Sequence, residues 1–199
     1  LRGRLNLGVL AGDPRTSFEA TEAALEIARR FGLRGYIRTL VGNLAGACMD
    51  VGEWDQANRE LTAARDDSPD ELAANHASWA LFNFTSWRGD DVTAELARLT
   101  AWADSFDEAG AREAVHDLRA QLAYATGDLV VACDEWMAFA PSDTLNAPFA
   151  YLGAGLAALM VADADRASAA LAAHEATARH GRLFSLDRRL IRAGLMGLG

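Results

Sequence analysis

Lysine is absent from this chain of 199 residues, and all nineteen basic residues are arginine. Schiff-base enzymes, P-loop nucleotide-binding proteins and protein kinases each depend on a lysine that acts as a nucleophile or holds phosphate. The sequence therefore excludes these classes. Together with abundant Ala, Gly and Asp, the bias toward arginine is typical of a bacterium with a GC-rich genome.

Cysteine and positive charge are also scarce. Cys48 and Cys133 lie 85 positions apart, each within an apolar helical pattern, which favours two small buried residues in a reducing cytoplasm over a disulfide. The formal net charge of -9 argues against direct binding of nucleic acid, because the phosphate backbone would be repelled. With 51% hydrophobic and 24% charged residues, the composition is that of a globular protein.

Long membrane segments and an export signal are missing as well. The uncharged stretch 144–162 approaches the length of a membrane span, but it contains Pro148 and Asn146 and follows the repeat described next, so we expect a helix buried within the protein. No signal peptide is recognised, and we expect a cytoplasmic location. The chain starts at Leu1 rather than Met, and we expect a piece excised from a longer protein.

What the sequence does contain is a repeated turn, in which a small residue precedes an acid. The successive acids are 40, 37, 38 and 35 residues apart, and the last interval becomes 37 if Ala164-Asp165 is the final turn. Glycine can end a helix in the left-handed conformation, and an acid suits the start of the next helix. The turns are Gly12-Asp13, Gly52-Glu53, Gly89-Asp90, Gly127-Asp128 and Ala162-Asp163.

The unit over residues 38–71 shows the helical pattern most clearly. Its first helix is predicted to bury residues at positions i, i+3, i+4 and i+7, and its second helix has a similar stripe. Ser68-Pro69 is predicted to end the second helix, because the residue before proline disfavours the helical conformation. The two stripes are Val41, Leu44, Ala45 and Cys48, followed by Ala57, Leu61 and Ala64.

This unit resembles the tetratricopeptide repeat (TPR) in Ala45, Gly52-Glu53-Trp54, Ala57 and Pro69. The resemblance implies an all-α fold, a right-handed α-solenoid of antiparallel helix hairpins with about ten or eleven helices. It extends less completely over the other units, since Asp91 replaces the turn aromatic of one and the last turn lacks glycine. We expect one TPR-like domain over 1–199, with repeats 1–33 (partial), 34–68, 69–107, 108–144, 145–181 and 182–199 (partial).

The segment 21–57 also resembles the C-terminal helical repeats of ATP-dependent LuxR-type transcriptional regulators and of adenylate cyclases linked to an AAA-type ATPase. Its resemblance lies in the run Ala28–Gly35, in Gly42–Ala45 and in Gly52–Ala57. In such proteins the ATPase and the output domain lie elsewhere in the polypeptide. The resemblance therefore implies a sensor or interaction domain of a bacterial signalling regulator.

Two short motifs suggest chemistry that their context argues against. His174-Glu175 and His180 are similar to a zinc-protease motif, but histidines six apart do not face one way on a helix, so we interpret them as a solvated helix end. Gly153–Ala158 fits the dinucleotide fingerprint, yet it lies inside a helical pattern and favours close helix packing. We expect no metal, no cofactor and no catalytic residue, and hence no enzyme.

One set of residues predicts a binding site. In a TPR-like solenoid, first-helix residues beside the packed stripe line the inner groove, and here they combine aromatic and amide groups that suit a peptide or small polar ligand. The alternative is that Trp79 and Trp87 are simply core residues. Gly42 and Gly46 either open space at this groove or let helices approach. The candidate residues are His76, Trp79, Asn83, Trp87, Asp117, Gln121 and Tyr124.

Our leading hypothesis is a non-catalytic protein-interaction or ligand-sensing domain. Its partner would be a protein or peptide, another domain of the same polypeptide, or a small polar ligand, and not a nucleic acid or a membrane. The alternative is a structural spacer or oligomerisation module without a small-molecule ligand. That alternative follows from apolar faces expected on the terminal helices, through which the chain would form a homodimer.

Overall fold

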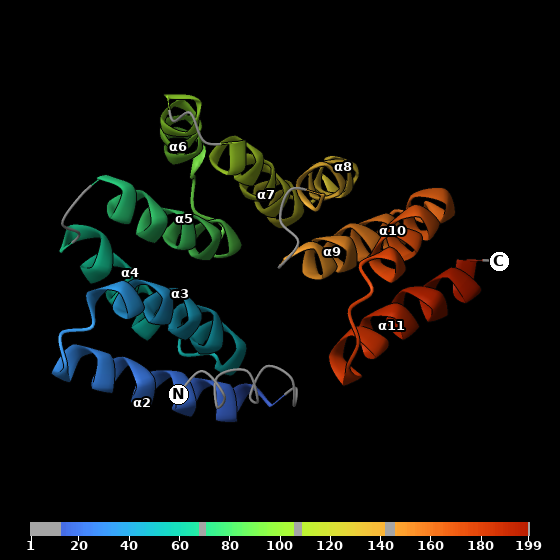
Figure 1. The fold of residues 1–199 in the computed structure, drawn as a ribbon. Helices are drawn as coiled ribbons and strands as arrows, with labels where there is room; N and C mark the ends of the chain where they lie inside the picture. Colours follow the sequence, from blue (N-terminus) through green and yellow to red (C-terminus); the bar gives the residue numbers. More distant parts are fainter. Residues whose placement is uncertain (1–12, 68–70, 106–108, 142–145, 199) are drawn as a thin grey trace. The chain divides into compact units, whose positions relative to one another are not determined.

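Every regular element of the described chain is an α-helix (Figure 1). The computed structural model describes residues 13–67, 71–105, 109–141 and 146–198. Ten helices, α2 to α11, lie in these ranges, and no strand does. The predicted all-α class is thus confirmed. The chain divides into two compact units, 1–85 and 86–199, and we describe each unit by itself.

The first unit is built on α3, which packs against α2 before it and α4 after it. Its buried core consists mainly of aliphatic side chains, among them Leu25, Leu44 and Leu61. The ring of Trp54 lies 5.4 Å from that of Phe84, which joins α5 to this core. The helices are α2 (Pro14–Arg30), α3 (Arg34–Val51), α4 (Trp54–Asp66) and α5 (Glu71–Trp87), the last of which runs into the second unit.

The second unit continues in the same manner, with consecutive helices side by side. Helix α8 packs against α7 and α9, and α9 also packs against α10 and α11. The core of this unit is rich in alanine, which allows the helices to approach closely, around the larger Trp136 and Phe139. Its helices are α6 (Thr93–Ser105), α7 (Ala109–Thr126), α8 (Leu129–Phe139), α9 (Ala147–Met160), α10 (Ala164–Ala176) and α11 (Arg182–Leu198).

The predicted turns that fall within the described residues have the expected backbone conformation, and Gly12 of the first turn lies outside them. Gly52, Gly89 and Gly127 all have φ between 83° and 85°, in the left-handed region that glycine adopts easily. The last turn is at Ala162, whose φ of 57° puts a non-glycine residue in the same region. Asp163 then caps α10, so the alternative turn at Ala164-Asp165 is wrong.

The acids after the turns were expected to suit the start of the next helix, and only some of them cap it. Asp128 and Asp163 each accept a hydrogen bond from a backbone N–H in the first turn of the next helix. Glu53 makes no such bond. At the third turn the carboxylate that accepts the bond, from the Thr93 N–H, belongs to Asp91 rather than to Asp90.

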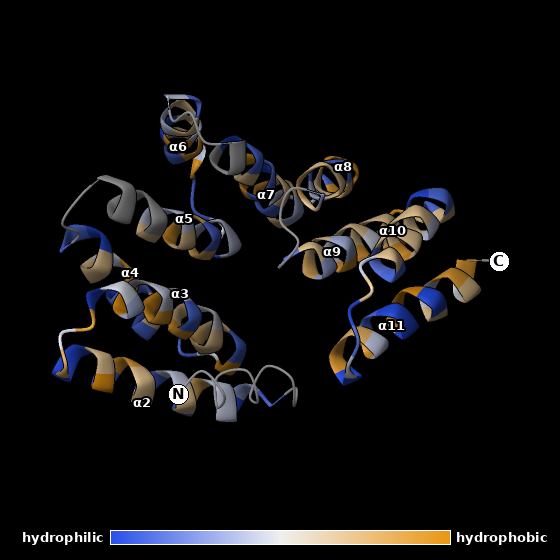
Figure 2. Ribbon diagram, in the orientation of Figure 1, coloured by the Kyte–Doolittle hydropathy of each residue, from blue (hydrophilic) through white to orange (hydrophobic). Residues whose placement is uncertain are grey.

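Helix α9 explains the glycines that fit a dinucleotide fingerprint. A Cβ atom added to Gly153 would lie 2.9 Å from the Trp136 ring, and one added to Gly155 would lie 2.8 Å from Ile191. Both glycines thus permit close helix contact, as predicted. Figure 2 shows α9 mostly in neutral and hydrophobic colours, and its sequence carries no charge. Even so, none of the described helices is both long and apolar enough to cross a membrane.

Two further predictions concern the glycines of α3 and the end of α4. A Cβ added to Gly42 or Gly46 would meet nothing within 4 Å, so the idea that these glycines let helices approach is wrong. Helix α4 ends at Asp66, and the proposed stop at Ser68-Pro69 lies outside the described residues.

Each expected repeat from residue 34 to 181 contains two of the described helices, α3 to α10, and 182–199 contains α11. Whether these pairs form a TPR-type solenoid stays a prediction.

Candidate functional site

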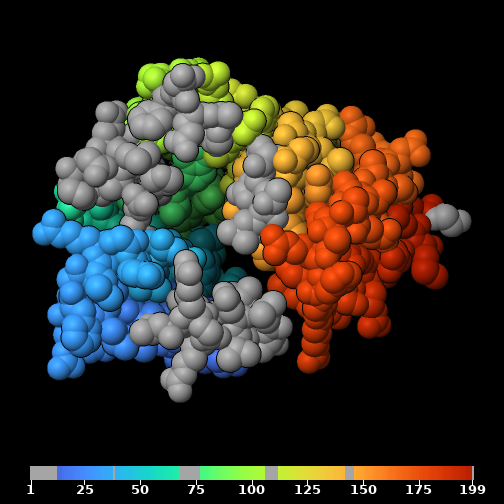
Figure 3. Space-filling model, in the orientation of Figure 1, coloured from blue at the N-terminus to red at the C-terminus, as the bar shows by residue number. Residues whose placement is uncertain are grey.

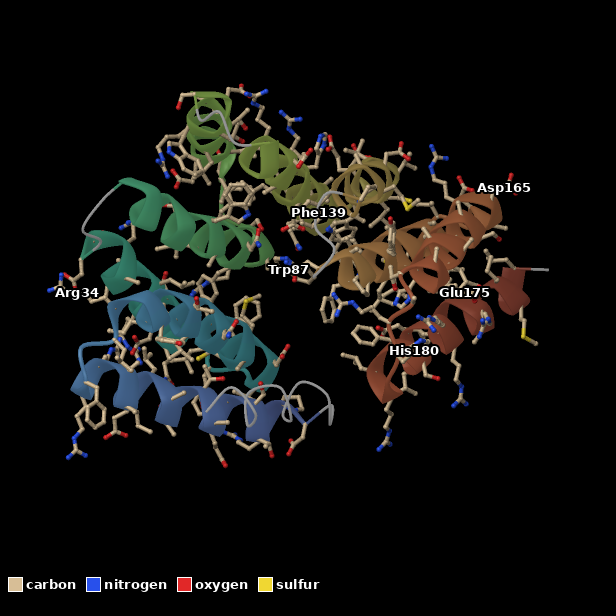
Figure 4. All side chains as sticks on the ribbon, viewed as in Figure 1. Arg34, Trp87, Phe139, Asp165, Glu175 and His180 are labelled. Carbon is tan, nitrogen blue, oxygen red and sulfur yellow. The ribbon has the colours of Figure 1, made fainter. Side chains whose placement is uncertain are left out.

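Four of the seven candidate residues come together in the second unit. Trp87 is the last residue of α5, where Figure 4 labels it. Asp117, Gln121 and Tyr124 follow one another on α7 at positions i, i+4 and i+7, which places them on one face of that helix. This face meets Trp87 on one side and Trp136 of α8 on the other.

A chain of hydrogen bonds fixes the polar groups of this face. The Trp87 indole Nε1 donates to Gln121 Oε1 at 2.9 Å, and Gln121 Nε2 donates a longer bond of 3.4 Å to Asp117 Oδ1. The same carboxylate oxygen accepts from Trp136 Nε1 at 3.1 Å. Because the amide nitrogen of Gln121 faces Asp117, its oxygen must face Trp87, so the orientation of the amide is determined.

The rings form a row beside these hydrogen bonds. The ring centroids of Trp87 and Tyr124 are 5.5 Å apart, and those of Tyr124 and Trp136 are 5.4 Å apart, with tilted planes in both cases. Such tilted contacts add to the stability gained by burial. The Tyr124 hydroxyl donates a weak bond to Met160 Sδ at 3.6 Å. We call Trp87, Asp117, Gln121, Tyr124, Trp136 and Met160 the aromatic–amide cluster.

This cluster extends from the core to the surface. Trp136 is only 5% exposed and lies against Gly153, where no side chain competes for the space. Tyr124 is half-buried, and Trp87 and Met160 are 45% and 63% exposed. The interpretation of Trp87 as a core residue is therefore wrong. A partly exposed indole and an exposed thioether, each in contact with Tyr124, form a surface on which an aromatic, aliphatic or proline side chain can pack.

The other three candidates are on α5 and belong to the first unit. Trp79 and Asn83 are half-buried, and the side chain of His76 lies outside the described part of the structure. Sequence reasoning thus selected seven residues, of which the structure brings four into one cluster. It missed Trp136 and Met160. Trp136 was visible as an aromatic residue one turn after Ala132 on the buried stripe of α8.

Nothing in the aromatic–amide cluster is an activated nucleophile. Neither of the two cysteine thiols of the chain belongs to this cluster, and both are buried. Burial and nearby carboxylates raise the pKa of Cys48 to about 11, and burial likewise raises the pKa of Cys133. Both are therefore protonated at neutral pH, which makes them poor nucleophiles. The cluster is equipped for stacking and hydrogen bonding.

A second polar group, between α10 and α11, is fully enclosed. His174 is 0% exposed, and its Nε2 lies 3.7 Å from Asp187 Oδ2, beyond hydrogen-bond distance. Its Nδ1 accepts a hydrogen bond of 3.2 Å from Arg188 Nε, and Arg188 also donates to the Arg179 carbonyl. The interpretation of His174 as part of a solvated helix end is wrong. His174 shares a stripe with Ala167 and Ala170, a signal that was available in the sequence.

The charge state of this pair follows from its surroundings. Because Nδ1 accepts from Arg188, the His174 proton sits on Nε2 and the ring is neutral. Burial and the neighbouring Arg188 guanidinium lower the pKa of His174, and burial raises the pKa of Asp187. The edge of the Phe184 ring covers the imidazole at 6.4 Å. A group this enclosed is a structural contact between helices rather than a site open to substrate.

Metal binding has no support in the described ranges, where no group of three or more His, Cys, Asp or Glu residues could hold an ion. His180 is exposed in the connection from α10 to α11 (Figure 4), whereas His174 is fully buried.

The first unit has an open groove of about 450 Å³ between α2 and α4. Two contacts cross it: Arg29 Nη2 donates to Glu60 Oε2 at 2.5 Å, and Gln56 Nε2 donates to Glu22 Oε1 at 3.1 Å. Its polar wall is dominated by carboxylates, and its lining residues include Glu19, Glu22, Glu26, Gln56 and Glu60.

Comparison with known proteins gives no relative for this chain. No protein-family model, curated protein or solved structure matches it.

Proposed function

We propose that this chain is a non-catalytic interaction or ligand-sensing domain, of TPR-like solenoid architecture, in a bacterial signalling or transcriptional regulator. It binds a peptide or a small polar ligand through the aromatic–amide cluster. The consecutive pairing of helices α7 to α10 and the left-handed turns support the repeat architecture. The regulator context rests on the resemblance of residues 21–57 alone.

One observation carries the proposed binding site: the polar edge of Trp87 is held by Gln121 while 45% of the residue stays exposed. An exposed tryptophan ordinarily loses side-chain freedom when it binds a ligand, which weakens binding. Here the hydrogen bond and the Tyr124 ring have already fixed the indole. A ligand that stacks on it would lose less entropy, so the site is preorganised for binding.

The test is selection of binders from a displayed library of short peptides, followed by calorimetric titration of the selected peptide. We expect Trp87→Ala to weaken binding at least about tenfold, as loss of a central aromatic contact does. Val131→Ala is the matched control, because this exposed α8 residue lies outside the cluster. Circular dichroism checks that both variants remain helical.

Several outcomes would contradict this proposal. If no peptide is selected, or if the selected peptide binds Trp87→Ala as tightly as the unaltered chain, the cluster is not a binding site. If the chain instead forms concentration-dependent dimers and binds nothing in the library, the alternative of an oligomerisation module is favoured. Light scattering over a range of concentrations distinguishes these cases. Turnover of any substrate would overturn the non-catalytic assignment.

A further inference from the structure

Helix α11 has two apolar faces, of which only one is covered. The inner face carries Ile191, which is fully buried against Gly155 of α9. Gly194 lies on this side as well, where a Cβ atom would collide with Leu159 of α9. The inner face therefore accounts for the packing of α11 on the second unit.

The other face presents apolar side chains to solvent. Leu186 and Leu190 are 48% and 52% exposed, and Ala193 and Gly197 continue the same line toward the end of the helix. These four residues occupy positions i, i+4, i+7 and i+11, which is one face of an α-helix. We call them the outer stripe. Figure 3 shows α11, in red, at the surface of its unit.

The shape of the outer stripe suits a second helix. Its two large side chains lie toward the start of α11 and its two small residues toward the end. A crossing helix can approach closely at small residues while its own side chains interlock with large ones.

Arginine lines one edge of the stripe. Arg182 and Arg189 are both exposed, and their side chains have no hydrogen-bond or ion-pair partner among the residues that the structure describes. Arg188 and Arg192 of the same helix do have partners, His174 and Glu175 respectively. The two arginines of α11 that lack a polar partner among the described residues therefore both lie at the outer stripe, in a chain whose net charge is -9.

Neighbouring helices of this unit supply acids to such basic groups. His116 of α7 bonds Glu135 of α8 at 2.5 Å, and Arg166 of α10 pairs with Asp134 of α8 at 3.1 Å. Arg192 of α11 pairs with Glu175 of α10. In each of these contacts the basic side chain faces a helix that carries a carboxylate. The outer stripe has arginines at its edge but no such facing helix.

From this charge pattern we infer that the outer stripe of α11 is a docking surface for an acidic amphipathic helix of a partner protein. The apolar side of that helix covers Leu186 and Leu190, and its flanking Asp or Glu residues pair with Arg182 and Arg189. A second copy of α11 fits poorly, because the only acid of this helix, Asp187, is buried and cannot pair with the arginines of the stripe. The inference is independent of the aromatic–amide cluster, so either can fail alone.

The experiment uses the whole chain and two synthetic peptides about 18 residues long, or five helical turns. Both carry the same leucine and alanine stripe, flanked by glutamate in one peptide and by lysine in the other. Fluorescence anisotropy of labelled peptide measures binding at low and at high salt. We expect the acidic peptide to bind at least about tenfold more tightly than the basic one, with a preference that weakens as salt rises.

Substitutions in α11 test whether the peptide binds at the outer stripe. Arg189→Glu should reduce or reverse the preference for the acidic peptide, and Leu190→Glu should abolish its binding. Arg34→Glu is the matched control for charge, because Arg34 is an exposed arginine of the first unit whose side chain makes no ion pair in the described part of the chain. It changes the net charge equally and should leave the preference intact.

Several results would overturn the inference. These are the absence of peptide binding, equal affinity for the two peptides, and a preference that survives Arg189→Glu. A dimer in sedimentation velocity that Leu190→Glu dissociates would show that a second copy covers the stripe. Binding to anionic phospholipid vesicles that Leu190→Glu abolishes would assign the stripe to a lipid surface instead.

Discussion

The two units share one way of packing helices but present different surfaces. In the first unit, carboxylates on α2 and α4 line an open groove, and Glu22 and Glu60 already hold polar partners there. In the second unit, a row of aromatic rings reaches the surface at Trp87 and arginines edge the outer stripe of α11. The net charge of -9 therefore describes neither surface well, and the ligand that each surface can bind depends on its local charge.

The contrast also extends to how each surface is supported. The acidic groove rests on aliphatic residues such as Leu25 and Leu44, which are typical of any helical core. The aromatic–amide cluster rests on Trp136, a large buried side chain that also donates a hydrogen bond to Asp117. Substitutions in the core should consequently affect the candidate binding surface of the second unit more directly than that of the first.

The largest effect on stability should come from Trp136→Ala. Removing a buried tryptophan creates a cavity and leaves Asp117 without one donor, which should lower the free energy of unfolding of the second unit by about 3–5 kcal/mol. Hydrogen exchange read by mass spectrometry should show faster exchange in α7 to α9 and unchanged exchange in α2 and α3. Chemical denaturation gives the total loss.

Trp87→Ala is the control for that experiment. Its indole is 45% exposed, so we expect a loss of stability of no more than about 1 kcal/mol. Equal losses for the two variants would contradict the supporting role of Trp136, and faster exchange that spreads to α2 would show that the two units do not respond separately.

A smaller effect should appear on acidification, through the enclosed pair His174 and Asp187. The folded state disfavours protonated His174, so this residue alone reduces stability as the pH falls through its ordinary value of 6.5. The raised pKa of Asp187 acts in the opposite direction, because the folded carboxyl group takes up a proton more readily than the unfolded one. Asp187→Asn removes this compensation.

We therefore expect Asp187→Asn to lose stability more steeply than the unaltered chain between pH 7 and 5.5, by at most about 1.4 kcal/mol for each pH unit below 6.5. Urea denaturation at the two pH values measures the difference. His180→Asn is the control, since His180 is exposed and is not part of the enclosed pair. A variant with the same pH dependence as the unaltered chain would contradict this account of the pair.

The sequence predicted what depends on local chemistry and missed what depends on which helices meet. The turns at Gly52 and Gly127 could be predicted because only glycine adopts the left-handed conformation easily. Asp117, Gln121 and Tyr124 could be chosen because their spacing puts them on one helix face. The hydrogen bond from Trp136 to Asp117 was not visible, since it joins residues 19 positions apart on different helices.

His174 shows the other source of error. Its motif with Glu175 and His180 directed attention to metal chemistry, and the rejection of that chemistry led to a solvated position. The stripe formed with Ala167 and Ala170 would have predicted burial. A polar residue on an apolar stripe is better interpreted by its helix face than by its neighbours in sequence.

The last comparison is between the turn at Ala162 and that at Gly127. Both turns close with the same backbone hydrogen bonds, Asp163 N to Ala158 O at 2.9 Å and Asp128 N to Ala123 O at 2.8 Å. Gly127→Ala should cost about 1–2 kcal/mol of stability, because it forces an alanine into the left-handed region.

Ala162→Gly should have the opposite sign. It relieves that strain, but the glycine makes the unfolded chain more flexible, which cancels about 0.5–1 kcal/mol of the gain. We expect a net stabilisation of about 0.5 kcal/mol, measured as a higher midpoint in urea. Ala178→Gly, at the other alanine with positive φ, makes a useful second case, since its φ of 52° predicts the same sign. Destabilisation by Ala162→Gly would mean that the alanine makes contacts whose loss outweighs the backbone strain.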